Sequence, residues 1–168
     1  YKTYLACDAV SEEILLSHHY RCNEKIIAFN NQKYYNNKLV INSQSQADTP
    51  LIFKNIAGNT TNYKNTAPRE AEEIIEFIKD NPDKSIGVIT PFTNQKELIH
   101  AMLQENGMKD VPCGTVHAFQ GDEKDVVLFS LALTEQTGQG TYDWLKNNKE
   151  LINVATSRAK EQLVIPFL

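Results

Sequence analysis

The stretch Val126-Val-Leu-Phe-Ser-Leu-Ala-Leu133 decides the fold of this chain. Its apolar residues follow one another without alternating with polar ones, which is typical of a strand buried on both faces. Ile86-Gly-Val-Ile89 has the same character, and shorter strands are predicted at residues 51–53 and 163–165. Strands buried on both faces belong to parallel sheets that helices cover. The sequence therefore predicts an α/β domain with a mainly parallel sheet.

Three amphipathic helices are predicted beside these strands. The first is capped by Asn23 and extends to about residue 35. The second begins at Pro68, carries apolar residues at helical spacing, and ends before Asn81-Pro82. The third follows Thr93 and ends at Asn106-Gly107. Strands that alternate with helices in this way predict one domain with helices packed on its sheet.

The composition narrows the class of protein. A chain of 168 residues is long enough for one domain with a real core, and no apolar run approaches the roughly 20 residues that span a bilayer. Three scattered cysteines without a Cys-x-x-Cys pair favour a reducing compartment, for which we expect the cytoplasm. The net charge of −4 argues against nucleic-acid binding through bulk positive charge. Any contact with nucleic acid must therefore be local.

Two arginines are candidates for binding phosphate. Arg21 precedes the first predicted helix, whose N-terminal amides also favour anions, but it can equally pair with Glu24 or another surface carboxylate. Arg158 is expected to project from the polar side of a helix, where a solvated arginine is the alternative. The neighbouring His18-His19 pair lacks a third ligand at a recognisable spacing, so no metal site is predicted.

The stretch between residues 115 and 123 offers groups that suit a nucleotide or a nucleic acid. Gly121 permits a sharp turn after a strand expected at residues 115–118, and Glu123 can then accept hydrogen bonds from ribose; an ordinary turn is the alternative. Thr115 and His117 are expected on one face of that strand, where they can meet a phosphate or base or can be satisfied within the core.

A second candidate for nucleic-acid contact is the predicted strand end at Thr90 and Pro91. The chain enters a helix there, so backbone amides can hold a phosphate without net positive charge; a capped strand-to-helix turn is the alternative. Ligands of open α/β sheets bind at one edge of the sheet. We therefore expect residues 115–125 and 153–160 to meet there and to share one ligand.

The order and spacing of these segments resemble the second RecA-like domain of superfamily 1 helicases, in the branch with Phe-Gln-Gly-x-Glu-x-Asp in motif V. Tyr20-Arg21 looks like the arginine motif before the first helix. Residues 87–92 with Gln95 look like the element that touches the nucleic-acid backbone, residues 115–125 like motif V and residues 153–160 like motif VI. The resemblance covers nearly the whole chain.

The resemblance implies a three-layer RecA-like domain of the P-loop NTPase type. It implies that Arg21 and Arg158 contact the γ-phosphate of ATP, as arginine fingers do. Glu123, Gly121 and Gln120 would hold the nucleotide, with Gln120 placed to couple it to the nucleic acid. A single strand, with DNA favoured over RNA, would run along Thr90, Pro91, Thr115 and His117.

Two departures from the family pattern qualify this prediction. Thr156-Ser157 stands where motif VI more often has leucine and threonine, which leaves Arg158 in register. No Gly-x-x-x-x-Gly-Lys-Ser/Thr loop occurs, nor an Asp-Glu pair after an apolar strand. We therefore expect residues 1–168 to be a single C-terminal helicase domain, inactive alone. An N-terminal RecA-like domain of the same parent protein would bind ATP and Mg²⁺.

Two other interpretations remain open. A non-catalytic RecA-like module would grip single strands or a protein partner and would have no use for Arg21, Glu123 and Arg158. An unrelated α/β nucleotide-binding or signalling domain would carry these residues by coincidence. In that case the three side chains would lie far apart.

Overall fold

The computed structural model describes residues 18–43, 45, 47–56, 58, 64–116, 118–119 and 123–167. Five strands form one sheet in which every pairing is parallel. Their spatial order is β3 (Leu51–Asn55), β7 (Ala159–Phe167), β6 (Lys124–Phe129), β4 (Ile86–Thr90) and β5 (Cys113–Thr115). A separate parallel pair consists of β1 (His18–His19) and β2 (Val40–Ile41). The prediction of a mainly parallel sheet is confirmed.

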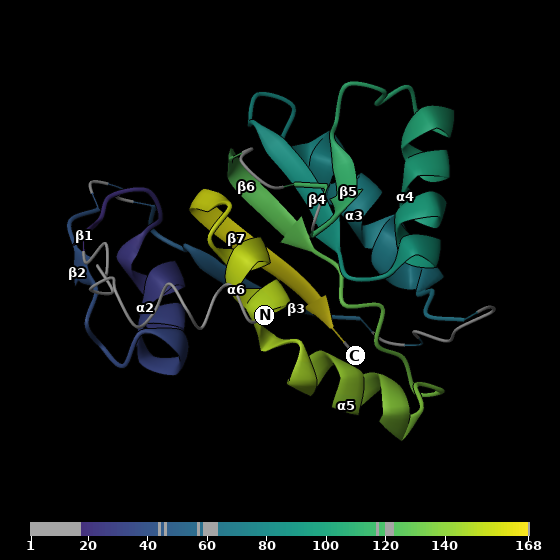
Figure 1. The fold of residues 1–168 in the computed structure, drawn as a ribbon. Coiled ribbons are helices and arrows are strands. Elements are labelled where there is room, and N and C mark those ends of the chain that lie inside the picture. The colour runs from purple at the N-terminus through teal and green to yellow at the C-terminus, as the bar shows by residue number, and fades with distance from the viewer. Residues whose placement is uncertain are drawn as a thin grey trace, which may run out of the picture.

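Helices cover both faces of the five-stranded sheet, which gives three layers (Figure 1). One face carries α2 (Glu24–Tyr34) and α6 (Lys149–Thr156). The other carries α3 (Pro68–Asp80) and α4 (Thr93–Glu105). The remaining helix, α5 (Gln139–Asn147), follows the loop after β6 and packs through Leu145 against Phe92 and Ala132. This arrangement is the predicted three-layer α/β architecture.

The apolar run of β6 is explained by its position between the two helical layers. Val127 and Phe129 pack in the cluster that includes residues of α2 and α6, whereas Val126 and Leu128 pack with α3 and α4. All four are almost fully buried. Burial of each such side chain contributes about 1.5–3 kcal/mol, so both faces of the strand stabilise the fold.

The three predicted helices are confirmed. The side chain of Asn23 accepts a hydrogen bond from the backbone N–H of Lys25, as expected of an N-terminal cap. Pro68 is the first residue of α3. Beyond α4 the chain turns at Gly107, whose φ of +74° lies in the left-handed region that favours glycine. None of the helices in the described ranges is long and apolar enough to cross a membrane.

Strand ends differ from the prediction where local hydrogen bonds bend the chain. β6 ends at Phe129 instead of Leu133, because the next residues bond to α3 and Ala132 adopts a φ of +50°. β5 ends at Thr115 instead of residue 118, because the carbonyl of Thr115 accepts hydrogen bonds from the amides of Ala118 and Phe119. The expectation that the strand extends to residue 118 is therefore wrong. His117 itself lies outside the described residues.

Candidate nucleotide and nucleic-acid sites

Arg21 and Glu123 form an ion pair at the amino end of the sheet. The distance from Arg21 Nε to Glu123 Oε1 is 2.8 Å. Arg21 lies just before α2, and Glu123 immediately precedes β6. Their side chains are 59% and 23% exposed, respectively. Arg21 thus does pair with a carboxylate, but with a candidate nucleotide-binding residue and not with its neighbour Glu24.

Arg158 lies in the turn between α6 and β7. Because α6 ends at Thr156, the expectation that Arg158 projects from a helix is wrong. Its Nε donates a hydrogen bond to the carbonyl of Val154 over 3.3 Å, and its own carbonyl accepts one from the N–H of Lys124 over 3.1 Å. The second bond places Arg158 beside the residue that follows Glu123.

The thiol of Cys22 lies near these charged groups. Cys22 is fully buried, and its Sγ donates a hydrogen bond to the carbonyl of Ser157 over 3.2 Å. The pKa of this thiol is raised to about 12, first by burial and then by the charge of Glu123, while the charges of Arg158 and Arg21 act in the opposite direction. The charges of Arg21, Glu123 and Arg158 thus all act on this thiol, and we call these three residues the arginine cluster.

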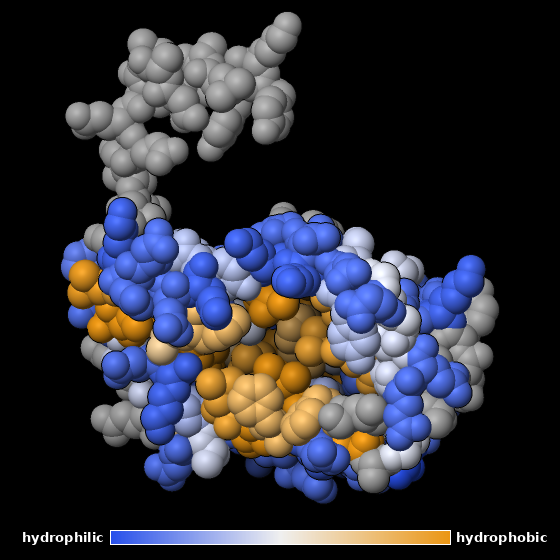
Figure 2. All heavy atoms as spheres, turned by 90° about the horizontal axis from the view of Figure 1, so that it is seen from below, coloured by the Kyte–Doolittle hydropathy of each residue, from blue (hydrophilic) through white to orange (hydrophobic). Residues whose placement is uncertain are grey.

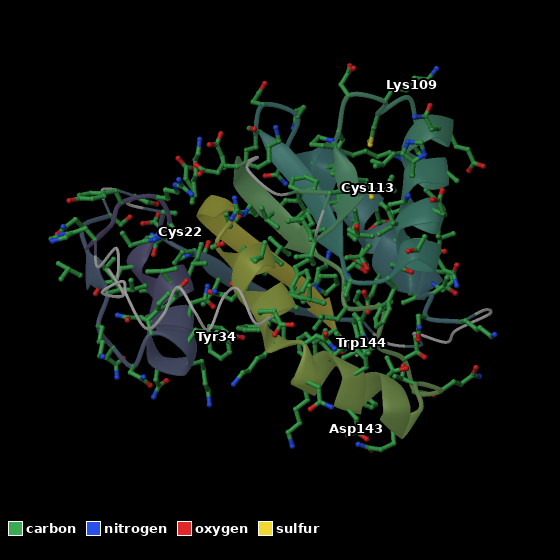
Figure 3. All side chains as sticks on the ribbon, viewed as in Figure 1. Cys22, Tyr34, Lys109, Cys113, Asp143 and Trp144 are labelled. Carbon is green, nitrogen blue, oxygen red and sulfur yellow. The ribbon has the colours of Figure 1, made fainter. Side chains whose placement is uncertain are left out.

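Hydrogen bonds fix the segment that carries Arg21 onto the sheet. The N–H of Asn23 donates to the carbonyl of Lys160 in β7 over 2.8 Å. The N–H of Cys22 donates to His19 Nε2 over 3.1 Å, so this nitrogen carries no proton. Burial, and then the charge of Arg21, lowers the pKa of His19, whereas Glu123 acts in the opposite direction. Figure 3 shows Cys22 where the unit of β1, β2 and α2 meets the sheet.

The candidate nucleic-acid residues lie at the opposite, carboxyl end of the sheet. Thr90 ends β4, Thr115 ends β5, and the two residues are paired in register. Thr90 is fully buried, and its Oγ1 accepts a hydrogen bond from the N–H of Phe92 over 3.3 Å. Its hydroxyl therefore holds the turn that presents Pro91, which is half-buried.

Gln95 is a structural residue of the same turn. It is fully buried, accepts a hydrogen bond from the N–H of Ala67 over 2.8 Å, and donates to the carbonyl of Ala67 and to Ser130 Oγ. Ser130 Oγ in turn donates to Glu70 over 2.6 Å, and the N–H of Ala132 donates to the same carboxylate over 3.0 Å. The side chain of Gln95 thus bonds within the protein, and nucleic-acid contact by the element that contains it stays a prediction.

Sequence reasoning missed Glu70, although the sequence carries a signal for it. Glu70 lies one helical turn before Ile74, on the apolar stripe of α3, and it is fully buried. A carboxylate on a buried stripe needs hydrogen-bond donors. Ser130, which interrupts the apolar run after β6, is one of them.

Comparisons with known proteins agree with the fold described above. Residues 3–166 match the family model described as an AAA domain. The chain belongs to this family. Together with its relatives, this match makes the chain a RecA-like domain of a superfamily 1 helicase.

Several curated helicases are similar to this helicase domain. The match is 29% identical to an uncharacterized ATP-dependent helicase of Methanocaldococcus jannaschii, covering 90% of this chain and 26% of the relative. The chain is also 31% identical to DNA polymerase alpha-associated DNA helicase A of Saccharomyces cerevisiae, over 87% of this chain and 26% of that helicase. It is 26% identical to the mouse RNA helicase Mov10l1, over 95% of this chain and 16% of that helicase. The chain thus spans about a quarter or less of the length of these relatives.

One solved structure has a comparable fold. It is the C-terminal domain of a possible DNA helicase from Lactobacillus plantarum, with a TM-score of 0.55 and 14% sequence identity over 89% of this chain and 87% of that one. At this identity the likeness concerns the fold alone.

Within the helicase domain, the segment after β5 crosses the face of the sheet between the two candidate sites. Phe119 is almost fully buried and packs over Gly87 and Gly114. A Cβ atom on Gly87 would lie 2.9 Å from the ring of Phe119 and 2.9 Å from Lys124 Cγ. These glycines therefore make room for the chain to return from the carboxyl end of β5 to the amino end of β6. Gln120 and Gly121 lie outside the described residues.

The two candidate sites of the helicase domain are separated by the length of a strand. Thr115 ends one strand and Glu123 precedes the next, and neighbouring strands run parallel. Five residues of strand extend about 16 Å. One ligand shared by the whole of residues 115–125 with residues 153–160 does not fit this arrangement, because Thr115 lies at the carboxyl end of the sheet whereas Lys124 bonds to Arg158 at the amino end.

Proposed function

We propose that this chain is the second motor domain of an ATP-dependent superfamily 1 helicase or translocase. The observation that carries the proposal is the arginine cluster, in which Arg21, Glu123 and Arg158 converge from three segments that are distant in the sequence. Two guanidinium groups and one carboxylate leave a local positive charge on a chain whose net charge is −4. A phosphate group of a bound nucleotide is a ligand that this local charge suits.

In this proposal Arg21 and Arg158 act as arginine fingers. They contact the γ-phosphate of ATP held by an N-terminal RecA-like domain of the parent protein, which also holds Mg²⁺ because this sequence has no phosphate loop. Glu123 accepts hydrogen bonds from the ribose, and Gln120 and Gly121 take part in binding the nucleotide. The exposure of Arg21 allows its side chain to exchange Glu123 for the phosphate when the two domains close.

The proposed track for a single strand lies at the carboxyl ends of β4 and β5. Pro91, Thr115 and His117 line it, while the buried hydroxyl of Thr90 holds its turn in place. The adjoining N-terminus of α4 has no side-chain cap, so its backbone amides can meet a phosphate. We propose a single strand as the ligand, with DNA as the first candidate and RNA tested beside it, because contacts of this kind read the backbone.

The test is ATP hydrolysis by the full-length parent protein, with and without single-stranded DNA or RNA. Arg158→Ala is expected to lower the stimulated rate by about 10³-fold or more, the magnitude typical of arginine fingers, while ATP binding persists. Arg69→Ala is the matched control, because Arg69 is an exposed arginine paired with Glu72 on α3. It should leave the rate unchanged.

An unchanged rate in the Arg158→Ala protein would exclude the arginine-finger role. A parent protein that binds single strands but hydrolyses no ATP would instead support the non-catalytic module. The 168-residue chain by itself is expected to hydrolyse no ATP, since it lacks the phosphate loop.

A further inference from the structure

We propose that Trp144 is a stacking platform for a nucleobase at the carboxyl end of the sheet. This inference rests on the proposed function, since it assigns a base of the same single strand to a site beside Pro91. None of the residues assigned to the track above lies on α5, the helix that carries Trp144.

A cavity of about 340 Å³ separates α5 from the turn between β4 and α4. Pro91, Phe92 and Thr93 line it from the turn, and Thr141 and Trp144 line it from α5. This volume falls within the range of small-molecule sites, about 300–1,000 Å³. The cavity adjoins the proposed track directly, because Pro91 belongs to both.

Trp144 combines exposure with support from behind. The residue is 41% exposed, although its ring lies 5.6 Å from that of Phe92, which is only 9% exposed. The next residue, Leu145, is buried against Phe92 and Ala132 and fixes α5 to the domain. Figure 3 shows Trp144 on the side of α5 that faces the domain, with Asp143 pointing away. An indole held in this way offers area for stacking without having to be ordered first.

The lining of the cavity suits a neutral aromatic ligand with polar edges. Its described residues include no charged side chain. Thr141 Oγ1 donates a hydrogen bond to Asn65 Oδ1 over 3.3 Å, so a hydroxyl and a carboxamide lie at the rim. Figure 2 shows the molecule from below, where apolar surface is bordered by hydrophilic residues; of the described residues that line the cavity, only Phe92 is strongly hydrophobic. Bases stack on aromatic side chains with little dependence on sequence, which a motor that moves along a strand requires.

The sequence makes this inference directly measurable, because Trp144 is its only tryptophan. Indole fluorescence of the 168-residue chain is recorded while dT15 or U15 is added, and binding is measured separately by the anisotropy of a labelled copy of each oligonucleotide. Fluorescence is expected to be quenched along the same titration curve as the anisotropy change. The arms with dT15 and U15 distinguish DNA from RNA.

Substitutions separate stacking from folding. Trp144→Ala is expected to weaken binding about 5- to 100-fold, which corresponds to the loss of one stacked base. Trp144→Phe keeps a ring and should recover most of the affinity. Tyr142→Ala is the matched control, since Tyr142 is a similarly exposed aromatic residue on the same helix outside the cavity lining, and it should leave affinity unchanged.

Each result that differs from these expectations would overturn one part of the proposal. Binding without quenching, or equal affinity of the Trp144→Ala and wild-type chains, overturns the stacking role and leaves the proposed track intact. Equal weakening by Tyr142→Ala and Trp144→Ala would assign the effect to the packing of α5. Absence of binding to both oligonucleotides would overturn the proposed track and this inference with it.

Discussion

Arg21 Nε and Glu123 Oε1 lie 2.8 Å apart, although the two residues come from opposite halves of the sequence. Because Arg21 is more than half exposed, the pair is of the surface type, whose contribution to stability is about 0–1 kcal/mol. A contact of this strength can be exchanged for a phosphate at little cost. The pair is therefore better suited to orienting Arg21 than to holding the fold together.

Glu123→Gln is expected to lower the free energy of unfolding by no more than about 1 kcal/mol, while raising the KM for ATP of the full-length parent protein. Urea unfolding of this chain and ATPase assays of the parent measure the two effects. Glu72→Gln, which breaks the exposed pair with Arg69, is the control and should leave KM unchanged. A large loss of stability with an unchanged KM would show that Glu123 serves the fold.

Gly87→Ala is expected to destabilise the domain by about 1–3 kcal/mol, because the new methyl group would meet the ring of Phe119 at the crossing between the two sites. Urea unfolding measures this. Gly140→Ala is the control: nothing lies within 4 Å of its added Cβ, and alanine is favoured in helix α5. The control should be neutral or slightly stabilising. Equal stability of the two variants would contradict the close packing of Phe119.

Glu70→Ala is expected to be one of the most destabilising substitutions on α3. It leaves Ser130 Oγ and the N–H of Ala132 without the carboxylate that accepts their hydrogen bonds, and each unsatisfied buried group costs about 1–3 kcal/mol. Glu72→Ala, on the same helix but with a side chain that is 45% exposed, should change stability little. Thermal unfolding distinguishes them, and similar midpoints would show that the buried network contributes nothing.

Stability is expected to fall as the pH is lowered below about 6.5, partly through His19. The folded state lowers the pKa of His19, so the unfolded chain binds the proton more tightly. The contribution of His19 to the free energy of unfolding is therefore complete above the pKa of His19 in the unfolded chain. It is lost as the pH falls through the lower pKa of His19 in the folded state. Arg21 and Glu123 are the charges that act on it.

His19→Gln is expected to flatten this part of the pH profile of unfolding free energy. His100→Gln, at an exposed position of α4, serves as the control and should leave the slope as in the wild type. An identical slope in wild type and His19→Gln would contradict the lowered pKa of His19 in the folded state.

Local periodicity predicted most of the fold but not the ends of its elements. The apolar stripe of α3 and the unalternating run of β6 are properties of contiguous residues, and both elements occur where they were expected. The strand ends at Thr115 and Phe129 depend on which carbonyl or carboxylate oxygen accepts hydrogen bonds from the backbone amides that follow. Helix α5, which carries Trp144, was not predicted at all.

The sequence by itself determined a parallel α/β domain and the identity of the candidate residues, because burial patterns and motif spacing depend on the order of residues along the chain. Only the tertiary structure decided which of these residues meet. It brings Arg21 to Glu123 and Arg158 to the neighbouring Lys124, buries Gln95 against Ser130, and places Thr115 at the far end of the sheet. The physical reason is that hydrogen bonds, ion pairs and burial at these positions come from partners on other elements, which no local pattern encodes.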